Sequence, residues 1–518
     1  MNVSFWRSSL LALSMTMAGM MLTGCGGGSS DSAAAPSTST SISGSVVAGP
    51  VNGCELTVHD TTGNRVAGPV TSNSGAFTVM VPNTRLAEEL VFQCTGGTYT
   101  DEATGNTTTA ATLSGRFSAG TLSANASAIL TPGTTVIHGL IEAGLTRAAA
   151  EAAFAGAFGY TPASGIAPNV NGAGTDDENL AGLRAAAFSW LTKKLGLTPG
   201  QQFAMLSAII EDLAADSTLD GVGPVVMTLP KDTCNRFGAS LIAQGSAMGL
   251  TANKLGTLPF AKVAETATYR IEYQPMMMGA MQGKTVFKFL ITDLNGTPVI
   301  GETPTIKATM EMATMRHGTP VDGVTEQGSG IYQGTLYYLM ASMMNGMSAG
   351  YWSLDITVNG ETATFYPTVG MAMGDTTRAT LKDANDKISI MGNQQVRSYY
   401  LFKDSLSGTT GNHTLGLFIA TRDQNMMTHP ALALGLDLHD ENGTIWTVNS
   451  VAVEVSTDGG LNWRTMTDDA TGHWSISALT GLVDGQSNDI LVRLTVNGVE
   501  KTTDGTVAGN PATFTVTP

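Results

Sequence analysis

Methionine and histidine are the residues of this chain whose types and spacing could do chemistry. Fourteen of its 26 methionines lie between Met276 and Met391, where an even spread would place about six. Thioether sulfur is a soft ligand that suits Cu(I), and imidazole binds copper in either redox state. The candidate ligands of a Cu(I) site are Met276, Met278, Met281, Met310, Met312, Met315, His317, Met427 and His429.

Strand signals around residues 307–358 suggest how such a site would be positioned. Alternating side chains would put Met315 and His317 on one face of a strand, and likewise Met310 and Met312. The loop at residues 276–281 would then close over that face.

A second Met-x-His pairing, Met427 with His429, recurs further along the chain. The competing interpretation is that the methionines fill core gaps or form an adaptable surface for a protein partner. Met340 and Met344 would matter less for metal binding if they are core residues.

No catalytic sequence motif indicates that this chain is an enzyme. The sequence has no His-Glu-x-x-His, Gly-x-Ser-x-Gly, P-loop or dinucleotide fingerprint, and its seven histidines are scattered. A formal net charge of −16 argues against nucleic acid and against direct binding to anionic lipid headgroups, because both need clustered Lys and Arg. We therefore expect a non-enzymatic protein.

The N-terminus predicts the compartment. Arg7 precedes an apolar run at residues 10–21 that is too short to span a bilayer, and Leu-Thr-Gly-Cys25 follows it. This segment resembles a bacterial lipobox, which implies cleavage before Cys25 and a lipid on its thiol. Gly26 in place of Asp implies an outer-membrane lipoprotein that faces the periplasm or the cell surface. The alternative is an uncleaved signal anchor.

The remaining cysteines are Cys54, Cys94 and Cys234, an odd number in a compartment that permits disulfides. Cys54 begins one predicted strand and Cys94 ends another in the same domain, so we favour that pair. Cys234 is then a single buried thiol. If that choice is wrong, Cys234 is one of the bridged residues.

Periodicity and turn signals divide the chain into a mainly β, multidomain protein. The expected fold is an N-terminal β-sandwich, a small α-helical bundle and two C-terminal immunoglobulin-like β-sandwiches. The predicted segments are a signal peptide (1–25), a flexible tether (26–40), the first sandwich (41–130), the bundle (131–255), a Met-rich sandwich (256–375) and a last sandwich (376–518).

Capping signals mark the helices of the bundle. Thr131-Pro132, Thr146, Thr175 and Thr198-Pro199 each precede a stretch with helical spacing, and a last helix is expected at residues 235–248. The acids at 212, 216 and 220 do not match a calcium loop, so we interpret them as capping and turn residues, with a metal site as the alternative.

An internal repeat predicts that the two C-terminal sandwiches are related. Residues 354–365 and 494–514 both contain an Asn-Gly turn followed by Ala-Thr-Phe, and residues 287–293 match 417–423 loosely. The first unit, through residues 289–299, 315–320, 330–334 and 350–354, resembles the YtkA-like/FixH family of extracytoplasmic sandwiches, whose neighbours include copper-handling proteins.

Two further resemblances concern structure. Residues 42–47, 58–63 and 72–77 resemble the carboxypeptidase regulatory-like (transthyretin-like) sandwich, which implies a non-catalytic module. Ser456-Thr-Asp458-Gly-Gly-Leu-Asn-Trp463 resembles an Asp-box hairpin, in which the Ser and Asp tie the turn and the Trp packs beneath it.

These observations predict an outer-membrane-anchored envelope lipoprotein that binds or handles Cu(I) through a Met/His cluster. The alternative is a structural or adhesive cell-surface protein whose Met-rich face contacts an envelope or cell-surface protein.

Overall fold

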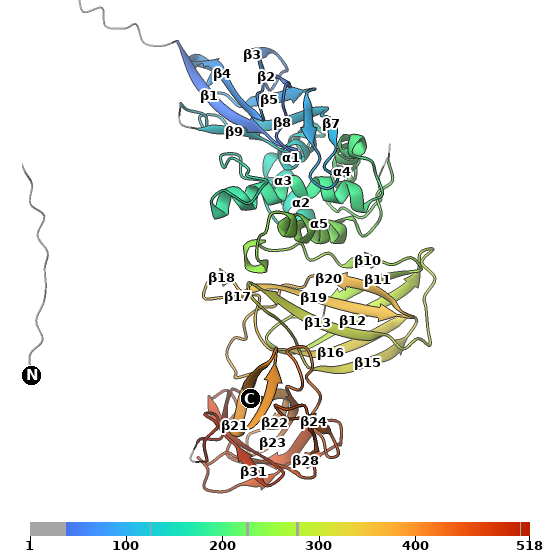
Figure 1. Ribbon diagram of the computed structural model, residues 1–518, viewed down its shortest axis with the longest axis vertical. Coiled ribbons are helices and arrows are strands. Elements are labelled where there is room, and N and C mark those ends of the chain that lie inside the picture. Colours follow the sequence, from blue (N-terminus) through green and yellow to red (C-terminus); the bar gives the residue numbers. More distant parts are fainter. Residues whose placement is uncertain (1–37, 125, 224–226, 276–278, 508) are drawn as a thin grey trace, which may run out of the picture. The chain divides into compact units, whose positions relative to one another are not determined.

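The computed structural model describes residues 38–124, 126–223, 227–275, 279–507 and 509–518, and it is mainly β (Figure 1). Strands β1–β9 come first, helices α1–α5 follow, and strands β10–β32 make up the remainder. The predicted mainly β, multidomain fold is confirmed.

The N-terminal sandwich consists of a sheet in the order β4-β1-β9, a sheet in the order β3-β2-β5-β8, and the small pair β6-β7. Its strands are β1 (Ser39–Val46), β2 (Glu55–Asp60), β3 (Arg65–Thr71), β4 (Ala76–Pro82), β5 (Leu90–Thr95), β6 (Thr98–Thr100), β7 (Thr107–Thr109), β8 (Thr112–Phe117) and β9 (Ser127–Leu130). On β4, Phe77, Val79 and Val81 alternate with exposed residues, and they pack with residues of the other sheet in one core.

The helical bundle follows directly. Its helices are α1 (Pro132–Glu142), α2 (Arg147–Phe158), α3 (Asp176–Lys194), α4 (Gln202–Asp216) and α5 (Thr233–Ala247). Thr131, Thr146 and Thr175 cap the first three helices through their side chains, as the sequence predicted. Phe154, Phe158, Phe188 and Phe237 are fully buried between the helices and form its aromatic centre.

The first Ig-like sandwich pairs a five-stranded sheet, β10-β11-β12-β16-β15, with a four-stranded sheet, β14-β13-β19-β20, and adds the hairpin β17-β18. Its strands are β10 (Val263–Glu265), β11 (Tyr269–Pro275), β12 (Gly283–Asp293), β13 (Thr305–Met312), β14 (Arg316–Gly318), β15 (Val321–Gly328), β16 (Ile331–Tyr338), β17 (Met343–Met344), β18 (Met347–Ser348), β19 (Gly350–Val358) and β20 (Glu361–Phe365). Trp352 lies at the centre of its core and is fully buried.

The second Ig-like sandwich pairs the sheet β21-β22-β23-β29-β28 with the sheet β27-β26-β30-β31, and β24-β25 form a separate hairpin. Its strands are β21 (Arg378–Ile390), β22 (Asn393–Thr409), β23 (Asn412–Thr421), β24 (Asp437–His439), β25 (Ile445–Thr447), β26 (Val451–Ser456), β27 (Arg464–Thr465), β28 (Thr467–Asp468), β29 (His473–Leu479), β30 (Asn488–Val496), β31 (Val499–Lys501) and β32 (Ala512–Val516).

The two Ig-like sandwiches have the same strand order. Taken across the sheet, β11, β12, β16 and β15 correspond to strands A, B, E and D of an immunoglobulin domain. Strands β14, β13, β19 and β20 form the opposite sheet. Strands β22, β23, β29 and β28 and strands β27, β26, β30 and β31 repeat this arrangement in the same sequence. The predicted repeat of immunoglobulin-like units is therefore visible in the topology.

The end of the chain lies beside the start of the second Ig-like sandwich. The Thr376 N–H donates to the Thr515 carbonyl at 2.8 Å, and the Thr517 N–H donates to the Asp375 carboxylate at 2.8 Å. We call residues 375–376 and 515–517 the terminal clamp.

Candidate functional site

The two Ig-like sandwiches meet at a buried aromatic contact. Tyr337 on β16 stacks on Phe418 on β23, with ring centroids 4.2 Å apart and planes inclined by 7°. The Tyr337 hydroxyl donates to Asp404 at 2.6 Å, and Lys284 pairs with the same carboxylate at 2.7 Å. Burial and the neighbouring Asp404 raise the pKa of Tyr337 well above its usual value, so this tyrosine remains a hydrogen-bond donor. We call this contact the Tyr337 junction.

Backbone contacts extend the Tyr337 junction along β14. The Gly318 N–H donates to the Met426 carbonyl at 2.8 Å. A Cβ on Gly318 would lie 2.6 Å from the Met427 carbonyl oxygen, so only glycine allows the two chains to approach this closely. A further hydrogen bond joins His473 Nε2 to the Asp322 carboxylate at 2.9 Å. These contacts hold residues 426–429 of the second sandwich against residues 316–318 of the first.

His317 lies at this boundary with both ring nitrogens engaged. Its Nδ1 is 2.7 Å from the Gly318 carbonyl oxygen, and its Nε2 is 3.3 Å from the Met340 sulfur. The ring meets Trp352 edge-on at 5.4 Å, and the Trp352 indole N–H donates to the Met340 carbonyl at 3.1 Å. Burial lowers the pKa of His317, with smaller contributions from the guanidinium charges of Arg422 and Arg378.

His429 is buried on the other side of the same boundary. Only 8% of the residue is exposed, and neither ring nitrogen makes a hydrogen bond. Burial, Arg422 and His317 lower its pKa to about 3, although the Met427 carbonyl lies near enough to oppose that shift slightly. The ring also lies 5.8 Å from the ring of Tyr400. His429 is therefore a neutral imidazole with two unused nitrogen atoms.

An open cavity of about 470 Å³ is lined by residues that are close in sequence to these two histidines. Five of its lining residues are methionines contributed by both Ig-like sandwiches: Met312, Met315, Met391, Met426 and Met427. Glu311, Thr314, Arg316 and Asn425 complete the lining. The Met-lined cavity thus borders the segments that carry His317 and His429.

The structure corrects part of the predicted ligand arrangement. Met310 is fully buried in the core of the first Ig-like sandwich and lies opposite His317 in the pairing of β13 with β14. Met315 lies in the turn between these strands and is exposed, whereas His317 is buried, so the two do not share a strand face. The turn, closed by the Met312 N–H to the Met315 carbonyl, breaks the alternation that the sequence suggested.

Other predicted ligands are separate from this boundary or undescribed. Met281 pairs with Gly370 and is not part of the cavity lining. Met276 and Met278 lie outside the described residues, as does Cys25. Sequence reasoning missed the role of Met340, which contacts His317 instead of filling the core alone. Its position 23 residues from His317, in the loop after β16, gave no local signal.

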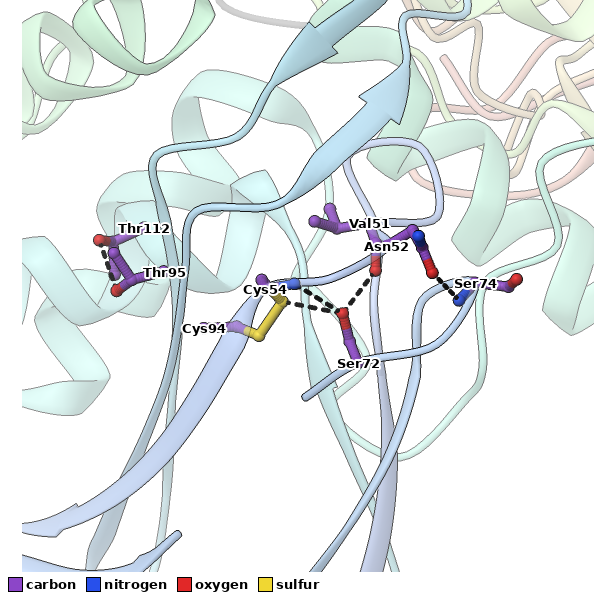
Figure 2. The surroundings of a disulfide bond; sticks show 8 residues. All are labelled: Val51, Asn52, Cys54, Ser72, Ser74, Cys94, Thr95 and Thr112. Carbon is purple, nitrogen blue, oxygen red and sulfur yellow. Dashed lines mark hydrogen bonds between the residues drawn. A yellow bond between two sulfur atoms is a disulfide. The ribbon is translucent and has the colours of Figure 1, made fainter. Parts of the chain in front are cut away.

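Cys54 and Cys94 form a disulfide in the N-terminal sandwich, with an S–S distance of 1.98 Å (Figure 2). Ser72 accepts a hydrogen bond from the Cys54 N–H at 3.1 Å and donates to the Val51 carbonyl at 2.8 Å, which fixes the loop before β2. Cys234 is a free thiol whose Sγ lies 3.6 Å from the Leu219 carbonyl, and burial raises its pKa to about 12.

The Asp-box residues tie a turn, as predicted. The Ser456 hydroxyl donates to Asp458 at 2.7 Å, Asp458 accepts the N–H groups of Leu461 and Asn462 at 3.0 Å, and the Trp463 indole N–H donates to Gly460. Arg493 lies 3.8 Å above the Trp463 ring.

The three acids at and just beyond the end of α4 accept backbone hydrogen bonds of the turn that follows the helix. Asp212 accepts the Gly221 N–H, Asp216 accepts the Thr218 N–H, and Asp220 accepts the Val222 N–H. In the described part of the chain, no three His, Cys, Asp or Glu residues are grouped so as to hold a metal ion. Among the helices in the described ranges, none is long and apolar enough to cross a bilayer.

The fold defines a multidomain protein with a tandem of immunoglobulin-like sandwiches. No family model matches the chain, and no curated protein matches it. Among solved structures, the Yersinia pseudotuberculosis adhesin InvE matches at 16% identity and TM-score 0.16, over 46% of this chain and 59% of that one. The Escherichia coli adhesin FdeC matches at 14% identity and TM-score 0.15, over 49% of this chain and 66% of that one.

Domains 5-6 of the S-layer protein SbsC match at 11% identity and TM-score 0.15, over 49% of this chain and 97% of that one. This chain covers less than two thirds of each of the two adhesin chains. TM-scores of this size do not indicate a shared arrangement, and the immunoglobulin-like assignment rests on the strand order described above.

Proposed function

We propose that this chain is a non-enzymatic structural or adhesive protein of the bacterial envelope. The observation that supports the proposal is the Tyr337 junction. Adjacent Ig-like sandwiches are joined there by a stacked aromatic pair, a shared carboxylate and a backbone hydrogen bond. Contacts of this kind restrict the movement of one module relative to the next, because the half-buried Asp404 would lose two partners if they separated.

Buried polar groups elsewhere also join parts of the chain to each other. Tyr99 of the N-terminal sandwich donates to Gln202 of the bundle at 2.8 Å, and Asn235 of the bundle donates to the Thr364 carbonyl of the first Ig-like sandwich at 2.8 Å. A catalytic site would instead need such groups to converge on a pocket with matched acid, base or nucleophile roles. Mechanical continuity is therefore the function that this use of polar groups favours.

The proposal includes the outer-membrane location predicted from the sequence. A lipid on Cys25 would anchor the protein to the outer membrane, and the Gly- and Ser-rich residues that follow would connect that anchor to the first sandwich. The sandwiches would then be presented to the periplasm or the cell surface, where an envelope or cell-surface protein is the expected partner. The acidic net charge of −16 would keep the presented modules apart from anionic membrane lipids.

Deletion and resupply of the protein in the producing bacterium test this proposal. Cells without the protein should attach less to polystyrene and to one another, or should become more sensitive to detergent, and the full chain should restore the original behaviour. A chain ending at residue 375 should be exported but should not restore it. Immunoblotting of the membrane fraction is the control for equal amounts. Unchanged attachment, aggregation and detergent sensitivity after deletion would contradict the proposal.

A further inference from the structure

The contact between His317 and Met340 leaves two lone pairs facing each other. The Gly318 carbonyl is an acceptor only, so the nitrogen 2.7 Å from it, Nδ1, must carry the ring proton. In a neutral imidazole the other nitrogen, Nε2, then has no proton to give. Nε2 nevertheless points at the Met340 thioether sulfur, another acceptor, at 3.3 Å.

A second proton on the ring would resolve this contact, but the surroundings oppose it. His317 is only 6% exposed, so a charged ring would be poorly solvated there. A cation bound by both lone pairs resolves the contact without protonating the ring. Burial thus favours the form of His317 that a metal ion requires.

We propose that the boundary between the two Ig-like sandwiches holds a soft monovalent metal ion of the Cu(I) class, bound by His317 Nε2, Met340 Sδ and His429. This inference goes beyond the structural role proposed above and does not depend on it. It also replaces the ligand set expected from the sequence, since it retains His317 and His429 and adds Met340.

His429 supplies the missing third donor. Its ring is buried, neutral and without a hydrogen bond at either nitrogen, which is rare for a buried polar group. The Gly318–Met426 hydrogen bond brings together the segments that carry both rings. Bound metal would give His429 the partner that the protein does not.

The spacing of the first two donors suits such an ion. With metal–nitrogen and metal–sulfur distances of about 2.0 and 2.3 Å, a separation of 3.3 Å corresponds to an angle of roughly 100° at the metal. This is near the tetrahedral value. Neutral nitrogen and thioether donors favour soft Cu(I) over Zn(II).

The Met-lined cavity is the proposed approach from solvent to this site. Arg316 and Met427 line it, and they are one and two residues from His317 and His429 in the chain. Exposed thioethers such as Met315 would attract a soft ion weakly and release it to stronger donors. In this arrangement the cavity methionines affect the delivery of the ion, and the buried ligands His317, Met340 and His429 determine the affinity for it.

Competition with a chromogenic Cu(I) chelator under reducing conditions tests the assignment on the full chain. Cys25 and Cys234 are replaced by Ser so that no free thiol competes for copper. We expect one Cu(I) per chain at micromolar chelator. Met340→Leu, His317→Gln and His429→Gln should each weaken binding at least tenfold. Zn(II) added in equal amount should not displace the copper.

Matched variants distinguish the buried set from the surface methionines. Met344→Leu changes an exposed methionine on β17 and should leave the affinity unchanged. Met315→Leu should also leave it unchanged. Met340→Leu keeps the volume of the side chain, and calorimetry of the metal-free variant verifies its fold. The proposal is overturned if the parent chain takes no Cu(I), or if Met315→Leu weakens binding while Met340→Leu does not.

Discussion

Replacing Glu102 with Gln should stabilise the protein at neutral pH, although Glu102 is hydrogen-bonded. Glu102 lies where the loop between β6 and β7 meets the helical bundle, and the Ser189 hydroxyl of α3 donates to its Oε2 at 2.8 Å. The residue is partly exposed, but its Oε1 is out of contact with solvent and has no hydrogen bond. Burial is the largest cause that raises the pKa of this carboxyl to about 8.

The size and sign of the effect follow from the two states of this group. The folded protein binds a proton on Glu102 up to about pH 8, whereas the unfolded chain releases it near the ordinary value of 4.5. The free energy of unfolding therefore falls as pH rises between these values, by about 1.36 kcal/mol per pH unit. At pH 7 the loss reaches at most about 3 kcal/mol, since the residue is partly exposed. The side chain of glutamine does not ionise, so the substitution removes this loss in the free energy of unfolding.

Hydrogen exchange of peptides from α3 measures the local free energy of opening in a chain this large, where a single two-state transition is not expected. Glu102→Gln should slow exchange up to about a hundredfold at pH 7. At pH 5 the gain should be small. The control Glu55→Gln, at an exposed position on β2, should show no such pH dependence. Faster exchange in Glu102→Gln at pH 7, or an equal gain at both pH values, would refute the reasoning.

Three further outcomes are expected. Cys25→Ser should move the protein from the membrane to the soluble fraction, and recovery of the variant only with detergent would contradict a lipid anchor. Mass spectrometry of unreduced protein should find Cys54 linked to Cys94, and replacing both with Ala should cost about 3–4 kcal/mol for the separation of 40 residues. Gly318→Ala should cost about 1–3 kcal/mol by crowding the Met427 carbonyl and should split the calorimetric unfolding of the two Ig-like sandwiches, whereas one joint transition would contradict this.

Local signals were sufficient for much of the fold. Side-chain caps fix where helices begin, so Thr131-Pro132 and Thr175 predicted the first residues of α1 and α3 correctly. The hydrogen bonds of the Asp-box turn also stay within eight residues, between Ser456 and Trp463. Such features depend on neighbours in the chain, which a sequence displays directly.

The candidate site could be predicted only in part, because its contacts join distant segments. Composition identified His317 and His429 as residues of interest, and the buried boundary contains both. Strand alternation misplaced Met315, since a turn intervenes before β14. The contact between His317 and Met340 depends on the Trp352 hydrogen bond that fixes the Met340 backbone. No local pattern encodes that bond, nor the contact of Glu102 with Ser189 on α3.

The terminal clamp determines where anything attached to the C-terminal end would be placed. Because the Thr517 N–H is bonded to Asp375, the second Ig-like sandwich is entered and left at neighbouring points. A fluorescent protein fused after Pro518 would emerge beside residue 375, in the segment that connects β20 of the first Ig-like sandwich to β21 of the second. Closely spaced ends are also what allow a domain to be transplanted into a loop of another protein. The second Ig-like sandwich could therefore be inserted whole into a host loop with short connections on both sides.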